Sequence, residues 1–299
     1  MPEKGVRSTY SQCPFQLLMY ENDVVISTGT GFFYAQHQKE YIITNWHNVT
    51  GIDPYTGNLL DSKHRRPTRI VAKLSQWINN LDPRLFALIG LEVPIYSDDL
   101  QQTRWFEHPT LGPKCDVVAI PFARPDNMPP FMHNRPDKIS TIRIPVEPGN
   151  QVFIIGFPSG LSIGFGLPLW KSGYIASEPH YDVTLFGKVR DGGGLEGGIS
   201  IPAFFLDAAT RRGMSGSPVF ARYFGKWDMS DPYAEVDPAS SNFWSRKDIA
   251  LGESAMEFVG VYSGRVPAAE NEAALGICWK IQAIDDICDR RHLGTHPHT

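Results

Sequence analysis

The chain has 299 residues, 42% of them hydrophobic, which is enough for one large core or two modest ones. Its 27 glycines and 24 prolines suit many short strands joined by turns and argue against a helical bundle. A formal net charge of −4 gives no electrostatic reason to expect nucleic-acid binding, and no segment approaches the roughly 20 apolar residues of a membrane-spanning helix.

A histidine follows an early strand candidate. Residues 41–44 form a short β-prone apolar run, and residues 48–51 carry turn chemistry, so His47 lies on a loop at the end of a strand. A histidine in this place can reach a cleft and act as a general base. The alternative is a core histidine whose ring is satisfied by a backbone carbonyl.

A single carboxylate opens the next apolar run. Asp116 precedes residues 117–121, and its charge is costly to bury unless a partner such as a histidine N–H donates to it. We therefore predict that Asp116 orients His47. The alternative is an aspartate that caps the strand or a turn.

A turn signal at residues 146–150 separates two groups of strand candidates. We predict an all-β protein with one unit over residues 12–144, a second over 145–288, and the active site between them. Residues 282–288 have apolar side chains at helical spacing and should form a terminal helix. Residues 289–299 are expected to form a flexible tail.

The segment Gly213–Pro218 predicts a nucleophile loop. Gly213 can adopt a backbone conformation closed to most residues, so that its N–H and that of Ser215 converge on one oxygen as an oxyanion hole. Gly216 allows a sharp turn after the serine, and Pro218 leads into a strand. Taken alone, the motif is also compatible with an ordinary turn.

The sequence gives little support for a disulfide framework, a metal site or a secreted protein. The four cysteines are scattered and are expected to be free thiols, although Cys278 and Cys288 could approach one another. No spacing typical of a metal site is present, and we expect no metal and no cofactor. The N-terminus lacks a signal-peptide pattern, which favours a cytoplasmic location.

With His47, Asp116 and Ser215 in this order, the sequence resembles the trypsin-like serine proteases of the chymotrypsin fold. The resemblance covers about residues 29 to 288. Five further segments carry it: residues 29–33 and 172–177, which are similar to Deg-type bacterial members, 152–158, which resemble the strand opening the second barrel, 259–264, which resemble the strand that pairs with substrate, and 275–281, which resemble the last strand. The resemblance implies two six-stranded antiparallel Greek-key barrels with a short C-terminal helix, and no peptide-binding (PDZ) domain.

Two departures from the family pattern matter. Met214 stands where digestive proteases have an aspartate that pairs with a freed N-terminus, and no Ile-Val-Gly-Gly start is present, so activation by zymogen cleavage is not expected. A long stretch over residues 53–113, rich in proline, asparagine and aspartate, separates His47 from Asp116 and is interpreted as inserted loops.

The resemblance also implies a substrate pocket. Its base falls at Ala209, six residues before the nucleophile, so the acidic residue that selects lysine or arginine is missing. Arg211 and Arg212 lie near the implied pocket, which leaves an apolar, small or acidic side chain as the preferred one. The full set of implied substrate-binding residues is Ala209, Thr210, Ser263, Gly264, Arg265 and Gly276.

The function predicted on these grounds is a serine endopeptidase that acts on proteins or peptides through an acyl-enzyme, with activation by a separate partner as one option. The main alternative is a catalytically silent protease fold that serves as a scaffold or sensor. An esterase of the α/β-hydrolase type would carry its histidine last in the chain, whereas here it comes first.

Overall fold

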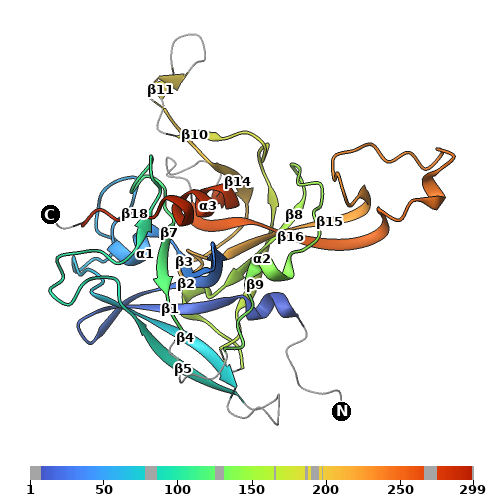
Figure 1. The fold of residues 1–299 in the computed structure, drawn as a ribbon. Coiled ribbons are helices and arrows are strands. Elements are labelled where there is room, and N and C mark those ends of the chain that lie inside the picture. The colour runs from blue at the N-terminus through green and yellow to red at the C-terminus, as the bar shows by residue number, and fades with distance from the viewer. Residues whose placement is uncertain are drawn as a thin grey trace.

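The computed structural model describes residues 8–77, 86–124, 131–164, 166–185, 188–189, 195–196, 198–265 and 275–297. The protein is mostly β (Figure 1). Its strands are β1 (Pro14–Glu21), β2 (Val24–Gln36), β3 (Lys39–Thr44), β4 (Arg69–Trp77), β5 (Phe86–Val93), β6 (Phe106–Glu107), β7 (Val118–Phe122), β8 (Gln151–Gly156), β9 (Leu169–Ile175), β10 (Val183–Leu185), β11 (Lys188–Val189), β12 (Leu195–Glu196), β13 (Ile199–Ile201), β14 (Ala203–Asp207), β15 (Pro218–Asp228), β16 (Ile249–Arg265), β17 (Leu275–Lys280) and β18 (His292–Leu293).

Helices are few and short. They are α1 (Trp46–Thr50), α2 (Pro136–Ile139) and α3 (Ile281–Arg290), with single 3-10 turns at Thr9–Gln12, Pro158–Gly160 and Phe243–Ser245. In the described part of the chain, none of them has the length and apolar character needed to cross a bilayer.

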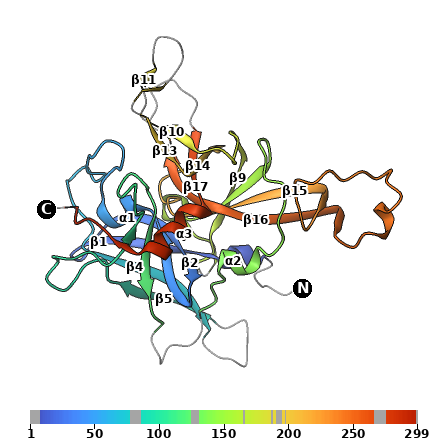
Figure 2. The ribbon, with the colours of Figure 1, turned by 45° about the horizontal axis from the view of Figure 1, so that its top comes forward.

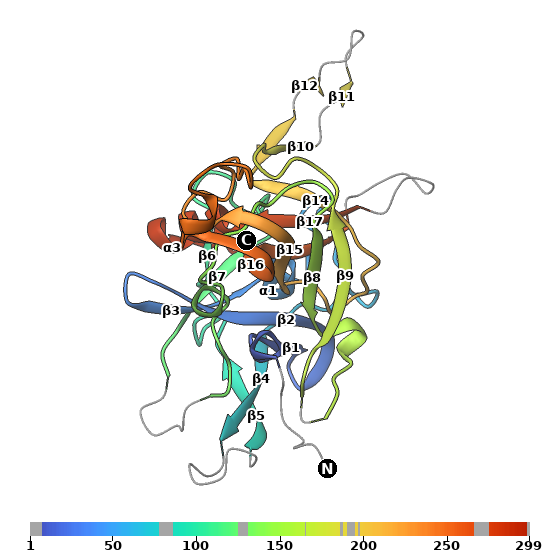
Figure 3. The same cartoon turned by 90° about the vertical axis from the view of Figure 1, so that its right-hand side faces the viewer.

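The second half of the chain forms a closed six-stranded barrel in the order β14-β17-β16-β15-β8-β9. The first half forms an eight-stranded sheet in the order β18-β6-β7-β3-β2-β1-β4-β5. The six-stranded barrel and the C-terminal helix are thus present in the second half. In the sheet of the first half, the β4–β5 hairpin projects away from the other strands (Figure 3). Strand β18 lies at the opposite edge of this sheet.

Two core clusters explain why several strands are apolar on both faces. In β2, Phe33 packs into the core of the first sheet, while its neighbours Phe32 and Tyr34 point to the opposite face. That opposite face joins residues of the barrel, among them Phe220 and Trp279, in a cluster shared by both halves. Successive side chains of such a strand therefore pack into two different cores. For this reason the sequences of these strands are continuous apolar runs.

Helix α3 closes the shared cluster. Ile284 and Ile287 are fully buried in it, and Asp285 accepts a hydrogen bond of 2.8 Å from the Tyr34 hydroxyl. After the helix, the chain runs on to the C-terminal end (Figure 2), and its strand β18 pairs with β6. The segment predicted to be a flexible tail contains the end of α3 and the strand β18.

The hairpin of β15 and β16 extends far beyond the barrel, and residues 229–248 form its tip (Figures 1 and 2). Arg246 pairs there with Asp228 and Asp248, which holds the two ends of the tip together. The sequence motifs contain no signal for this projection.

Candidate active site

His47 is positioned by β3 and the single helical turn that follows it. β3 lies between β2 and β7 in the sheet, and α1 begins two residues after it ends. The turn stops at Gly51, whose φ of +71° favours glycine and whose N–H donates to the His47 carbonyl. The predicted turn is thus one turn of helix, with His47 in its first half.

Asp116 reaches His47 because β3 and β7 pair in register. Thr44 at the end of β3 lies opposite Val118 at the start of β7, so the residues just beyond these ends become neighbours. The carboxylate of Asp116 accepts the backbone N–H of His47 at 3.0 Å, and its other oxygen lies 2.7 Å from His47 Nδ1. These two contacts fix the orientation of the imidazole.

Both side chains of the His47–Asp116 pair are largely buried. The Asp116 side chain is 1% exposed and that of His47 is 14% exposed. Burial lowers the pKa of His47, but the charge and hydrogen bond of Asp116 together more than offset it, so that the pKa is raised above 6.5. The carboxylate therefore stabilises the protonated imidazole, as a general base requires once it has accepted a proton.

Ser215 lies between β14 and β15 and is partly exposed. Its carbonyl accepts hydrogen bonds from the Thr30 N–H at 2.9 Å and from Asn48 Nδ2 at 3.2 Å, so residues of the first half hold the backbone of the serine. Within the described residues, the Ser215 hydroxyl makes no hydrogen bond to His47. Such bonds are commonly long in unliganded hydrolases and tighten when substrate binds.

The loop before Ser215 orients the backbone N–H of Gly213. Gly213 has φ +89°, and the Met214 N–H donates to the Arg211 carbonyl, which closes a turn. The Arg212 carbonyl accepts from the Ser159 N–H at 2.6 Å. Because the carbonyl and N–H of one peptide unit point in opposite directions, the Gly213 N–H points away from Ser159.

Glycine is needed at position 213 for space as well as conformation, since a Cβ there would lie 2.3 Å from the Phe157 carbonyl oxygen. Among the described residues, the N–H groups of Gly213 and Ser215 have no hydrogen-bond acceptor. An oxyanion hole consists of unpaired backbone N–H groups such as these two.

A cavity of about 340 Å³ lies beside Ser215. Of the predicted substrate residues, Thr210 and Gly264 line it, and Ala209 is exposed outside it. Ser263 is buried and accepts a hydrogen bond from the Trp279 indole. The side chain of Arg265 lies outside the described part of the structure.

The cavity wall includes one residue that sequence reasoning did not assign to the pocket. Tyr262 lines the cavity, and its ring covers Gly276, where an added Cβ would lie 2.7 Å from a ring carbon. Arg211 and Arg212, which the sequence analysis placed near the implied pocket, also line the cavity. Tyr262 lies in the run that resembles the substrate-pairing strand, and nothing in that pattern indicates that its side chain lines a pocket.

The end of β16 offers a free strand edge next to Ser215. β15 begins at Pro218, opposite Val261, and the chain before it turns into the Ser215 loop. Beyond that point, Gly264 and Arg265 pair with β17 on one side, and no described strand lies on the other. An extended peptide can pair with such an edge.

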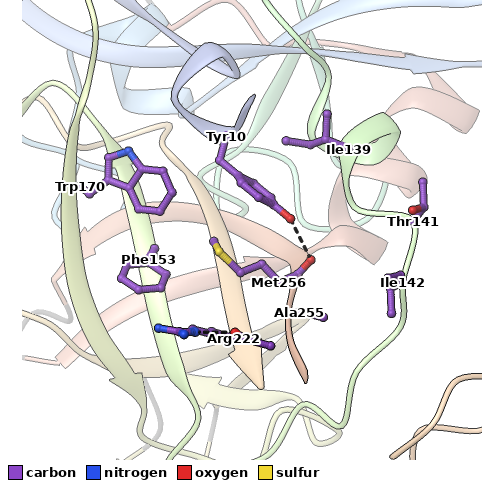
Figure 4. Close-up of a pocket in the computed structure, with 10 residues that line it drawn as sticks. Tyr10, Ile139, Thr141, Ile142, Phe153, Trp170, Arg222, Ala255 and Met256 are labelled. Carbon is purple, nitrogen blue, oxygen red and sulfur yellow. Dashed lines mark hydrogen bonds between the residues drawn. The ribbon is translucent and has the colours of Figure 1, made fainter. Parts of the chain in front are cut away.

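A second cavity, of about 400 Å³, lies on the outer wall of the barrel (Figure 4). Tyr10, Phe153, Trp170 and Met256 line it, and it contains none of the three predicted catalytic residues. A further cavity, of about 700 Å³, is lined by residues of β3 and β7 among others and likewise contains none of the three. The cavity beside Ser215 is therefore the candidate site.

All four cysteines are buried and free, so the alternative bridge between Cys278 and Cys288 is not formed. Burial raises the pKa of both thiols, that of Cys288 to about 12, which makes them poor nucleophiles. In the part of the chain that the structure describes, no three His, Cys, Asp or Glu side chains are grouped as metal ligands.

Residues 29–226 match the family model of the trypsin-like peptidase domain, which is more than half of the chain. The chain belongs to the trypsin-like peptidase family. A search of curated proteins finds no match to this sequence.

Solved structures similar to this peptidase domain include three proteases. They are the active form of the Rv3671c protease from M. tuberculosis (14% identity, 96% of this chain and 83% of that chain, TM-score 0.43), the HtrA-type protease AlgW with a tripeptide (14%, 94% and 62%, 0.43), and a serine endoprotease from Yersinia pestis (14%, 96% and 67%, 0.40). At these TM-scores, the family assignment rests on the sequence match.

Met214 shows how this peptidase domain anchors its loop without the aspartate of the digestive enzymes. The side chain is fully buried and belongs to the core cluster of the barrel, which also contains Ala208 and Tyr262. Apolar packing thus holds the residue before Ser215, so no charged partner is needed at this position.

Proposed function

We propose that this peptidase domain is an active serine endopeptidase with His47, Asp116 and Ser215 as its catalytic triad. The observation that supports this most strongly is the peptide unit between Arg212 and Gly213: the Arg212 carbonyl accepts from the Ser159 N–H, so the Gly213 N–H faces the opposite way. This orientation, together with the His47–Asp116 pair, is the arrangement that acyl transfer needs.

In the proposed reaction, Ser215 Oγ attacks the carbonyl carbon of a peptide bond while its proton passes to His47 Nε2. The amides of Gly213 and Ser215 stabilise the resulting oxyanion. His47 then gives the proton to the leaving amine as the C–N bond breaks. Water then attacks the acyl-enzyme while His47 takes its proton. The bond between the carbonyl carbon and Ser215 Oγ breaks, the acyl part leaves as a carboxylic acid, and His47 returns the proton to Ser215 Oγ.

The substrate backbone would pair with the free edge of β16 at residues 263–265, which places the scissile carbonyl beside Ser215. In the same proposal, the first-half sheet corresponds to the first of two barrels, and the shared core cluster joins it to the second. Protein or peptide chains are therefore the proposed substrates.

One observation favours the silent-scaffold alternative: the hydrogen bond between Ser215 and His47 is missing. The two functions are separated by incubating the purified protein with an unfolded protein such as reduced casein. We expect cleavage by the wild type and none above background with Ser215→Ala, at equal thermal stability, because this change removes a single hydroxyl group. Cleavage by Ser215→Ala at the wild-type rate would rule out the proposed nucleophile.

A further inference from the structure

Two residues with hydroxyl groups, Thr210 and Tyr262, line the cavity beside Ser215. Tyr262 is 1% exposed and Thr210 is 3% exposed, and their hydroxyls are hydrogen-bonded to each other. Because the Tyr262 ring covers Gly276, the space beneath it is closed to a large side chain. The cavity thus suits a short side chain with a polar end.

The cavity is also positively charged. Arg211 and Arg212 line it, both are exposed, and no acidic side chain is among the residues that form its wall. Within the described residues, neither guanidinium has an ion-pair partner. The protein as a whole carries a net charge of −4, so this concentration of positive charge is local.

Guanidinium groups bind carboxylates through two parallel N–H donors, and hydroxyls at the base of a cavity add further donors. A lysine or arginine side chain would be repelled, and an aromatic one would meet the Tyr262 ring.

We propose that this endopeptidase cleaves after glutamate or aspartate. Arg211 and Arg212 bind the carboxylate, and the Thr210–Tyr262 pair closes the base of the cavity. The proposal rests on the proposed function, because it concerns the side chain next to the bond that Ser215 attacks.

The test uses fluorogenic peptides that differ only in the residue before the cleaved bond. The residues compared are Glu, Gln, Asp, Asn, Ala, Lys and Phe. We expect kcat/KM for Glu to exceed that for Gln by at least tenfold, since this pair differs in charge and hardly in size. The Glu preference should shrink at high salt, because the guanidinium groups are exposed.

Arg211→Gln and Arg212→Gln should each reduce the Glu-to-Gln ratio at least threefold, while the Lys replacements keep part of it. The matched control is Arg222→Gln, which removes one exposed positive charge at the second cavity and should leave the ratio unchanged. Tyr262→Phe keeps the ring and removes one hydroxyl, and it should also lower the ratio.

Failure of the two proposals can be told apart by a small, uncharged fluorophosphonate probe that labels the catalytic serine without needing a side-chain contact. Labelling together with equal cleavage after Glu and Gln would overturn the acidic preference alone. Strong preference for Lys, Ala or Phe would do the same. No labelling of the wild type would overturn the proposed function itself.

Discussion

Thr30 connects the two halves of the molecule at the nucleophile loop. Its hydroxyl donates to the Gly213 carbonyl at 2.8 Å and accepts the Phe157 N–H at 3.3 Å, and its backbone N–H donates to the Ser215 carbonyl. Thr44 donates in turn to the Thr30 carbonyl. One fully buried residue of the first half therefore fixes the backbone on both sides of Met214: its hydroxyl binds the Gly213 carbonyl, and its backbone N–H binds the Ser215 carbonyl.

Replacement of Thr30 by valine keeps its shape and removes the hydroxyl. We expect a loss of about 1–3 kcal/mol in the free energy of unfolding, because a buried carbonyl and a buried N–H lose their partner. The rate of labelling by a fluorophosphonate probe should fall at least tenfold, since the Gly213 carbonyl loses the hydroxyl group that donates to it. Chemical denaturation and labelling kinetics measure the two effects.

Thr30→Ser is the matched control, because it retains the hydroxyl. It should restore most of the labelling rate even if stability is reduced by the lost methyl group. Equal labelling rates for Thr30→Val and the wild type would show that Thr30 contributes to folding only and does not position the loop.

His133 links elements of the first sheet. Its Nε2 accepts the Ser75 N–H of β4 at 2.9 Å, and its ring packs against Phe15 of β1 and Phe33 of β2. Burial lowers the pKa of His133 to about 4, from an ordinary value of 6.5.

This depressed pKa predicts acid sensitivity. Between pH 6.5 and 4, the unfolded chain binds a proton at His133 and the folded protein does not, so stability falls as the pH falls through this range. From pH 7.5 to 5.0, we expect the wild type to lose about 2 kcal/mol more than His133→Gln, whose side chain does not titrate. Urea unfolding of both proteins at the two pH values measures the difference. Parallel losses would contradict the assignment.

Some helices and strands can be predicted from the local sequence pattern, and others cannot. The strand before His47 and the apolar run after Asp116 were predictable because both are buried on each face. By contrast, β18 has two residues and no periodicity, and it exists only because the chain after α3 meets β6. The helical turn at His47 read as a turn because Val49 and Thr50 are poor helix formers.

At the scale of the whole molecule, the order of His47, Asp116 and Ser215 predicted the family, which the sequence match confirms. The lining of the cavity could not be predicted in full, because Tyr262 reaches it from a strand whose other residues are core. The strand order of the eight-stranded first sheet could not be predicted either, since its outer strands depend on long-range pairing and not on a local sequence pattern.

In the proposed mechanism, the two halves act together. The first half supplies His47 and Asp116, the second supplies Ser215, and residues of both halves pack in the shared core cluster. Whether these residues form a working nucleophile can be tested before any substrate is known.

The most direct measurement is labelling of the purified protein by a fluorophosphonate probe, with wild type, Ser215→Ala and His47→Ala compared at equal folded concentration. We predict labelling of the wild type, none of Ser215→Ala, and at least a hundredfold slower labelling of His47→Ala, because the general base is lost. Equal labelling of all three proteins, or no labelling of the folded wild type, would contradict the account.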